Sequence, residues 1–169
     1  RGLLHAVDPV RGAITLSRLD KADRRHILSL LDAGDAKEIL EILAYPADTA
    51  GAIMDPRVSH FRADSTVSDA LARLNELRHL RISSLHVVDE MGRYLGSTRL
   101  QDVALAEPSE PIKTLLGSAS ISVQAMAPLA EVVETLEAHN LPSLPVVDFH
   151  GRLVGVIRHE ALVSAVESD

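Results

Sequence analysis

The sequence contains no cysteine, which excludes disulfides, thiolate zinc sites and cysteine nucleophiles. Aromatic residues make up only 2% of the chain and tryptophan is absent, so no platform for stacking single-stranded nucleic acid is expected. The formal net charge of −7 argues against nucleic acid or another polyanion as the partner. What remains is an acidic chain with 46% hydrophobic residues, in which aliphatic side chains must form the core.

No apolar run approaches the roughly 20 residues that span a bilayer, and no signal peptide is present. The chain begins at Arg1 rather than at Met, so we expect a soluble piece of a longer protein. The lack of a membrane segment here does not show that the longer protein lacks one.

One ten-residue pattern, VVDxxGRxxG, occurs twice, at residues 87–96 and 146–155. In each copy an apolar strand ends at an Asp, a Gly permits a tight turn, and a second strand follows. The spacing of apolar residues predicts a helix before each hairpin and a closing helix after it. Each copy is therefore predicted to be β-α-β-β-α, an α+β fold. We expect six positions to be buried: Leu71, Leu74, Val87, Val133, Leu136 and Val146.

The residues before the repeats predict a short helical segment. Residues 1–16 contain Gly2, Pro9 and Gly12 and are expected to be irregular or to form a packed arm. From Asp20 an apolar stripe formed by Ile27, Leu28, Leu30 and Leu31 predicts a helix. Gly34 is placed as its C-terminal cap. Asp35 begins a capping-box pattern for the next helix, which carries Ile39, Leu40, Ile42 and Leu43.

The two hairpin repeats resemble a tandem pair of cystathionine-β-synthase (CBS) domains, a regulatory ligand-binding module. The string EILEILAYPADTAGAIMDP, residues 38–56, is similar to the junction before the CBS pair in MgtE-type magnesium transporters. The resemblance implies a tandem CBS pair behind a short N-terminal helical segment. The implied domains are a helical remnant (1–44), a connector (45–56), a first CBS domain (57–110) and a second (111–169).

The resemblance also implies a function: the cytosolic sensor of a magnesium or other divalent-cation transporter, on the cytoplasmic face of the inner or plasma membrane. In that family, magnesium bound among carboxylates draws the helical and CBS domains together and favours the closed pore. The implied partners are a membrane-spanning channel domain of the parent chain and a second copy in a CBS-mediated homodimer.

The metal ligands that we predict are Asp89, Glu90, Glu131, Asp148 and Glu160, because Mg²⁺ prefers oxygen ligands and takes one or two carboxylates. The alternative for each is an ordinary solvated charge. Ala125-Met126-Ala127-Pro128 stands where the family has acidic residues before the second long helix.

A competing site is a nucleotide pocket, since adenosine-binding CBS domains follow the hairpin with a Gly-x-x-Ser/Thr-x-x-Asp run. The first copy keeps the Asp as Asp102, with Arg99 at the hydroxyl position, so these two residues are candidates for binding ATP or AMP. The second copy has Arg158 and Ala161 at the equivalent positions. The alternative function is thus an adenine-nucleotide-sensing CBS module attached to another effector. No catalytic set of residues is apparent, and we do not expect an enzyme.

Overall fold

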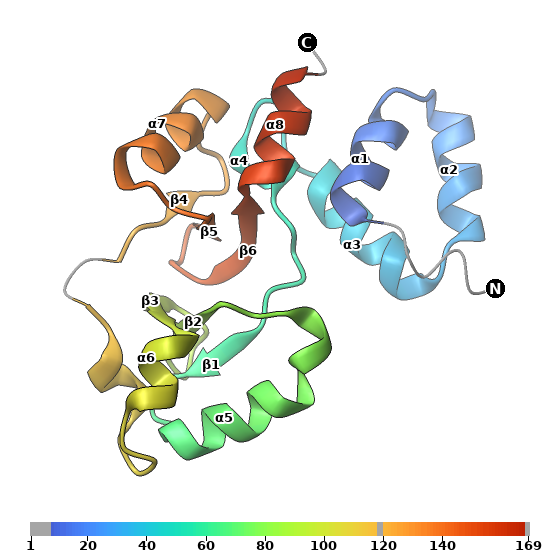
Figure 1. Ribbon diagram of the computed structural model, residues 1–169. Helices are drawn as coiled ribbons and strands as arrows, with labels where there is room; N and C mark the ends of the chain where they lie inside the picture. Colours follow the sequence, from blue (N-terminus) through green and yellow to red (C-terminus); the bar gives the residue numbers. More distant parts are fainter. Residues whose placement is uncertain (1–7, 118–119, 168–169) are drawn as a thin grey trace. The chain divides into compact units, whose positions relative to one another are not determined.

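A computed structural model describes residues 8–117 and 120–167, which fall into two compact units. Unit 2 comprises residues 59–122 together with 147–153. Unit 1 comprises the chain up to 58, residues 123–146, and the chain from 154 onward. The chain is α+β, as predicted, with one three-stranded sheet in each repeat (Figure 1).

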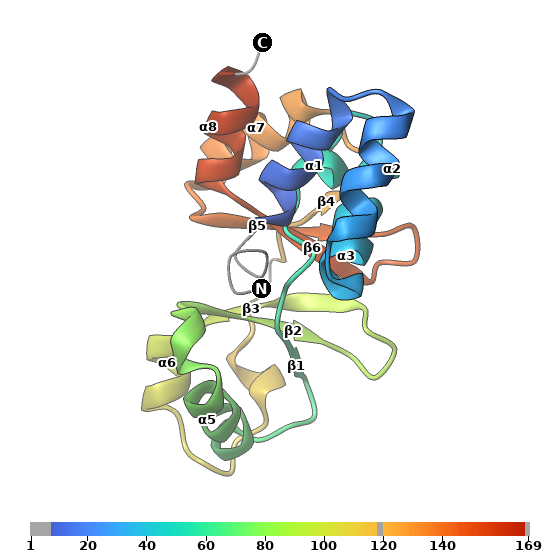
Figure 2. The same ribbon diagram turned by 90° about the vertical axis from the view of Figure 1, so that its right-hand side faces the viewer.

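The sheet of unit 2 has the strand order β1 (His60–Arg62), β2 (Ser84–Val88), β3 (Tyr94–Arg99). β1 runs parallel to β2, and β2 runs antiparallel to β3. The helices α5 (Val67–Glu76) and α6 (Leu100–Leu105) lie on one side of the sheet (Figure 2). Two 3₁₀ helices, η2 (Arg78–Leu80) and η3 (Ile112–Leu115), complete the unit.

The core of unit 2 forms where the strand and helix periods place apolar residues on facing sides. It includes Phe61, Val67, Leu85, Val87, Val103 and Ile112. Val87 is fully buried as predicted, whereas Leu71 and Leu74 are only partly buried against this core. Thr66 is the N-cap of α5 and forms a capping box with Asp69.

Unit 1 begins with three helices, α1 (Pro9–Ser17), α2 (Lys21–Leu30) and α3 (Ala33–Leu43). Each has an aspartate at its N-cap whose carboxylate accepts a backbone N–H, namely Asp8, Asp20 and Asp32. The prediction of irregular structure was wrong for residues 9–16. Gly34 lies inside α3 and caps no helix.

The three helices share a small core of Val10, Ala13, Leu16, Ile39 and Ile42. Leu28 and Leu31 pack against it. The predicted stripe on α2 is only half correct, because Ile27 and Leu30 are 37% and 61% exposed. Leu40 of α3 is also largely exposed.

The second repeat supplies β4 (Val123–Gln124), α7 (Leu129–His139), β5 (Ser143–Val147), β6 (Leu153–Arg158) and α8 (His159–Glu167), with the sheet order β4-β5-β6. Leu136 and Val146 are buried as predicted, and Val133 is partly buried. Pro128 is the N-cap of α7. None of the helices among the described residues is both long and apolar enough to cross a membrane.

The connector between the helical segment and the repeats is bonded to the second repeat. It contains α4 (Ala50–Ile53), whose Ala50 and Gly51 N–H groups donate to the carbonyls of Ala127 and Ala125, each over 2.8 Å. Further along, Asp55 and Val156 exchange two backbone hydrogen bonds of 2.8 and 3.0 Å. The connector therefore joins α1–α3 to the part of the second repeat that belongs to unit 1, residues 123–146 and the chain from 154 onward.

Candidate functional site

Two of the predicted metal ligands, Asp89 and Asp148, hold the hairpin turns in place. The Asp89 carboxylate accepts the N–H groups of Met91 and Arg93, each over 2.9 Å. The backbone N–H of Arg93 is the largest influence that holds the Asp89 pKa below its ordinary value. Desolvation is the second influence and raises the pKa, and the Met91 N–H and the Arg93 guanidinium lower it further. Gly92 completes this turn with a φ of +81°.

The second turn repeats the arrangement. Asp148 accepts the N–H groups of His150 and Arg152 over 2.8 and 3.0 Å, and Gly151 has a φ of +78°. The Asp and the Gly of the repeated motif therefore have a structural role. A metal ion at Asp89 or Asp148 would have to share the carboxylate with the turn.

The other predicted metal ligands, Glu90, Glu131 and Glu160, are all exposed. Glu131 and Glu160 belong to unit 1, and Glu90 belongs to unit 2. Across residues 8–117 and 120–167, no group of three or more His, Asp or Glu side chains is arranged to hold a metal ion. The five residues are thus a dispersed set and do not form one preformed site.

The predicted nucleotide ligands lie together at the start of α6. The Nε of Arg99 is 3.2 Å from a carboxylate oxygen of Asp102, and the two side chains are 71% and 45% exposed. A ribose at Asp102 would have to compete with this ion pair. The neighbouring Thr98 is buried, and its hydroxyl has no partner within the described part of the chain. Thr98 lies opposite Leu85 in the β2–β3 ladder, on the face that carries the core.

The opposite face of the same ladder carries a polar cluster that the sequence analysis missed. The Ser97 hydroxyl lies 2.8 Å from the Nδ1 of His86 and 2.6 Å from the Tyr94 hydroxyl. Burial raises the pKa of Tyr94, and its hydrogen bond with Ser97 lowers it by less. The alternation of β2 and β3 could have revealed this cluster, because His86 and Ser97 are cross-strand partners.

Unit 1 contains a pocket of about 80 Å³ between α1, the connector and the start of α8. Its floor is apolar, with Val10, Ile14, Ile53 and Val156 among its residues. Its charged residues are Asp8, Arg11, Asp55, Arg158 and Glu160. Glu160 is thus one predicted ligand that borders a cavity.

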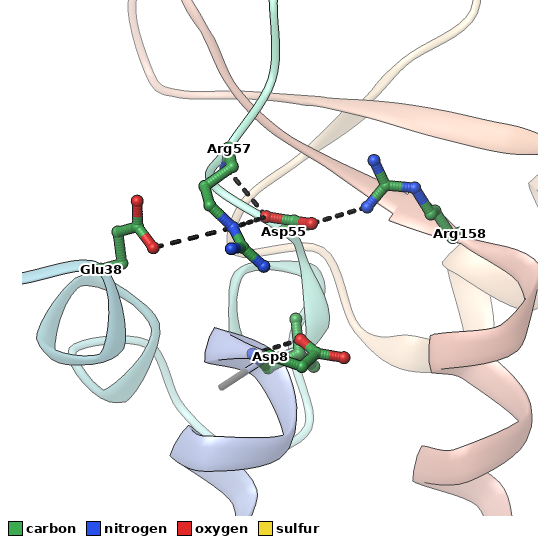
Figure 3. A network of polar contacts seen from close by, with 6 residues as sticks. Asp8, Glu38, Asp55, Arg57 and Arg158 are labelled. Atoms are coloured by element: carbon green, nitrogen blue, oxygen red, sulfur yellow. Dashed lines mark hydrogen bonds and ion pairs between the residues drawn. The ribbon is translucent and has the colours of Figure 1, made fainter. Parts of the chain in front are cut away.

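The Asp55 carboxylate is the centre of an ion-pair network beside this pocket (Figure 3). One oxygen accepts from the Nη1 of Arg158 over 2.6 Å, and the other accepts the Arg57 N–H over 2.9 Å and lies 3.5 Å from the Arg57 Nε. The same Nε lies 3.7 Å from Glu38 on α3. The Asp55 side chain is only 13% exposed, so the network joins α3, the connector and the end of β6 around a largely buried charge.

Glu38, at the far end of the network, has a raised pKa. Desolvation is the largest cause, and the neighbouring acids Asp35, Asp55 and Glu41 add to it, against the lowering effect of Arg57. The ion pair with Arg57 at 3.7 Å thus does not offset the desolvation of this carboxyl group together with its acidic neighbours.

Comparison with known proteins identifies two domains of one kind in the chain. The family model for the CBS domain matches residues 50–109 and again residues 112–168. The chain is 28% identical to magnesium transporter MgtE of Bacillus subtilis, over 97% of this chain and 40% of the relative. It is also 28% identical to magnesium transporter MgtE of Thermus thermophilus, over 89% of this chain and 34% of the relative.

Among solved structures, the cytosolic domain of the Mg²⁺ channel MgtE in complex with ATP aligns with a TM-score of 0.88 and 27% identity. The alignment covers 95% of this chain and 67% of that one, so it extends over the helical segment as well as both repeats. The chain spans well under half the length of the two curated relatives.

Proposed function

Because this chain belongs to the CBS domain family, we propose that it is the regulatory region of a magnesium or other divalent-cation transporter. The region lies at the cytoplasmic face of the membrane and acts on a membrane-spanning channel domain of the parent protein. It carries no reaction of its own. Cation-dependent rearrangement of the CBS and helical domains changes the state of the pore.

One observation supports this function above the others. The similarity to the MgtE cytosolic domain covers 95% of the chain, well beyond the CBS pair. The helical segment and its connector are bonded to the second CBS repeat, so a movement of one is coupled to the other. A generic CBS pair would not require the helical segment.

Divalent cations would bind at acidic side chains that lie apart from one another. The described residues of one chain offer no preassembled magnesium site, and Asp89 and Asp148 are held by their turns. The net charge of −7 makes acidic surfaces repel one another, and divalent cations offset that repulsion. Asp89, Glu90, Glu131, Asp148 and Glu160 remain the proposed contacts, each through ions that keep most of their water.

Thermal melting of the chain tests the cation response. One ion at ten times its dissociation constant stabilises the folded state by only about 1.4 kcal/mol, so a small rise in the midpoint is expected with Mg²⁺. Na⁺ at matched ionic strength is the control. An equal rise with both salts would mean that the chain only screens charge.

A flux assay on the parent protein in liposomes tests the gating function. Mg²⁺ on the side of this region should suppress flux, and removal of residues 1–169 should abolish the suppression. Flux that responds to Mg²⁺ equally well without the region would overturn the proposal.

We expect the chain to form a homodimer through its CBS domains. Unit 2 exposes several large apolar side chains, including Met91 (59%), Leu95 (41%), Leu105 (81%) and Phe149 (93%). A closed two-fold interface is the usual way to cover such residues. Sedimentation velocity should give twice the 18.2 kDa mass of the chain. A monomer at high concentration would contradict this.

Adenine nucleotide is a second candidate ligand, because the structurally similar MgtE cytosolic domain was solved with ATP. In this chain Asp102 would bind the ribose after release from Arg99. Calorimetric titration should show ATP or AMP binding that Asp102→Ala abolishes and that Asp64→Ala, at another exposed acid of unit 2, leaves unchanged. Binding that survives Asp102→Ala would exclude this site.

A further inference from the structure

The connector holds Asp55 in a fixed position at the edge of the second repeat. Its backbone exchanges two hydrogen bonds with Val156, the residue two positions before Arg158. Because both backbones are fixed, the carboxylate and the guanidinium meet across a separation of 103 residues in the sequence. The ion pair of 2.6 Å thus joins the connector to the junction of β6 and α8.

Both oxygens of the Asp55 carboxylate are occupied by arginine donors. Arg158 takes one, and the backbone N–H and guanidinium of Arg57 take the other. Arg57 also reaches Glu38 on α3 (Figure 3). Two acids and two arginines make this network formally neutral. With Asp8, Arg11 and Glu160 also at the pocket, the surroundings carry only one net negative charge, and a divalent cation would have to displace Arg158 to reach Asp55.

We propose that Arg158 is a built-in replacement for a bridging cation, which keeps the connector and helical segment on the second CBS repeat with or without divalent ions. The choice of magnesium as the ion that Arg158 replaces rests on the proposed function. A magnesium response of the wild-type chain would then arise at contacts other than those within unit 1.

The network predicts how the loss of Arg158 changes the response of this contact to divalent cations. Without Arg158, the largely buried carboxylate of Asp55 loses its 2.6 Å partner. The same pocket then holds the acids Asp8 and Glu160 against the single cation Arg11. The pocket becomes more negative, and a divalent cation gains the attraction that the arginine denied it. Arg158→Ala should therefore convert a contact that is independent of magnesium into one that depends on it.

Distances between spin labels test this within unit 1. The chain has no cysteine, so labels at Lys37→Cys on α3 and Glu134→Cys on α7, both exposed positions, are specific. The otherwise wild-type chain should give the same distance distribution in EDTA and in Mg²⁺. Arg158→Ala should give a broader and longer distribution in EDTA that Mg²⁺ narrows. Arg25→Ala, an exposed arginine of α2, removes the same charge and should behave like the wild type.

Asp55→Asn distinguishes the loss of the ion pair with Arg158 from a general loss of packing. It keeps an acceptor for the Arg57 N–H but removes the charge, so the distribution should broaden in EDTA and should not recover with Mg²⁺. Recovery of Asp55→Asn by Mg²⁺ would place the cation elsewhere and overturn the proposal. So would a wild-type distribution that narrows with Mg²⁺, or an Arg158→Ala distribution equal to the wild type in EDTA. A failed wild-type magnesium response in melting would instead count against the proposed function alone.

Discussion

Arg93 and Arg152 lie opposite each other in an antiparallel bridge, at the same position of the two hairpin motifs. The Tyr94 N–H donates to the Gly151 carbonyl over 2.9 Å, and the Leu153 N–H donates to the Gly92 carbonyl over 3.1 Å. In each bond the residue that follows the Arg of one motif copy donates to the carbonyl of the turn Gly in the other copy: Tyr94 to Gly151, and Leu153 to Gly92. The motif that repeats in the sequence therefore meets its own copy in space, and each turn must keep its shape for the pair to form.

Asp148→Ala should destabilise the chain by about 1 kcal/mol, because two N–H groups of the turn lose their acceptor and regain only water. Asp148→Asn should retain most of the stability, because an amide oxygen accepts the same bonds. Urea unfolding of both variants measures the difference. An equal loss in the two would mean that the charge of Asp148, and not its turn geometry, matters to the fold.

Glu38→Gln should leave stability at neutral pH unchanged or raised, despite the loss of an ion pair with Arg57. The pKa of Glu38 is raised in the folded state, chiefly by desolvation, so its ionisation opposes folding. The stability that the raised pKa confers is present below the unfolded pKa and lost as pH rises through the folded value. The free energy of unfolding of the variant relative to that of the wild type should therefore rise between about pH 4 and pH 7.

Urea unfolding across this pH range tests Glu38, with Glu137→Gln, at an exposed position of α7, as the control. A marked loss of stability in Glu38→Gln at pH 7 would show that the ion pair with Arg57 outweighs the desolvation of the carboxyl group.

The sequence predicted the repeats well because strand alternation and the turn chemistry of Asp and Gly are local signals. The sequence does not reveal α1, because Pro9 and Gly12 are typical of breaks, although Pro9 stands at the first helical position behind an Asp cap. The polar network at Asp55 could not be predicted. Its partner Arg158 is 103 residues away, and only the folded connector brings them together.

His60 should make the chain less stable in mild acid. Burial lowers the pKa of His60, and the nearby Arg73 lowers it further. As pH falls below the unfolded value of about 6.5, the unfolded chain takes up the proton first and folding stability decreases. The loss stops growing below the folded pKa, where both states are protonated.

Unfolding free energies of wild type and His60→Gln between pH 7.5 and 5 isolate this effect. The stability of the wild type relative to His60→Gln should fall as the pH falls, and His139→Gln, at an exposed position, serves as the control. A difference that stays constant with pH would contradict the lowered pKa.

Leu136→Ala should cost about 2–5 kcal/mol, because this α7 side chain is 4% exposed and its removal leaves a cavity. Leu30→Ala, at a 61% exposed position of α2, is the control and should change stability by less than about 0.5 kcal/mol. A loss below about 1 kcal/mol at Leu136 would mean that α7 is not packed on its sheet as described.

Gly155→Ala should loosen the connector, because β6 approaches it too closely for a side chain. A Cβ at Gly155 would lie 2.6 Å from the Met54 sulfur and 3.0 Å from the Asp55 carbonyl oxygen. The Met54 side chain can move, but the Asp55 carbonyl is held by its hydrogen bond from Val156. The expected loss is about 1–3 kcal/mol, as for other overpacked sites.

Gly117→Ala is the control, since a Cβ there meets no atom within 4 Å. Hydrogen exchange shows which backbone hydrogen bonds the substitution weakens. The N–H groups of Asp55 and Val156 should exchange faster in Gly155→Ala, while those of β2 and β3 in unit 2 keep their protection. Faster exchange in both units would mean that the substitution unfolds the whole chain. Unchanged exchange at Asp55 would show that β6 and the connector are not in contact, and the ion pair between Asp55 and Arg158 would lose its structural basis.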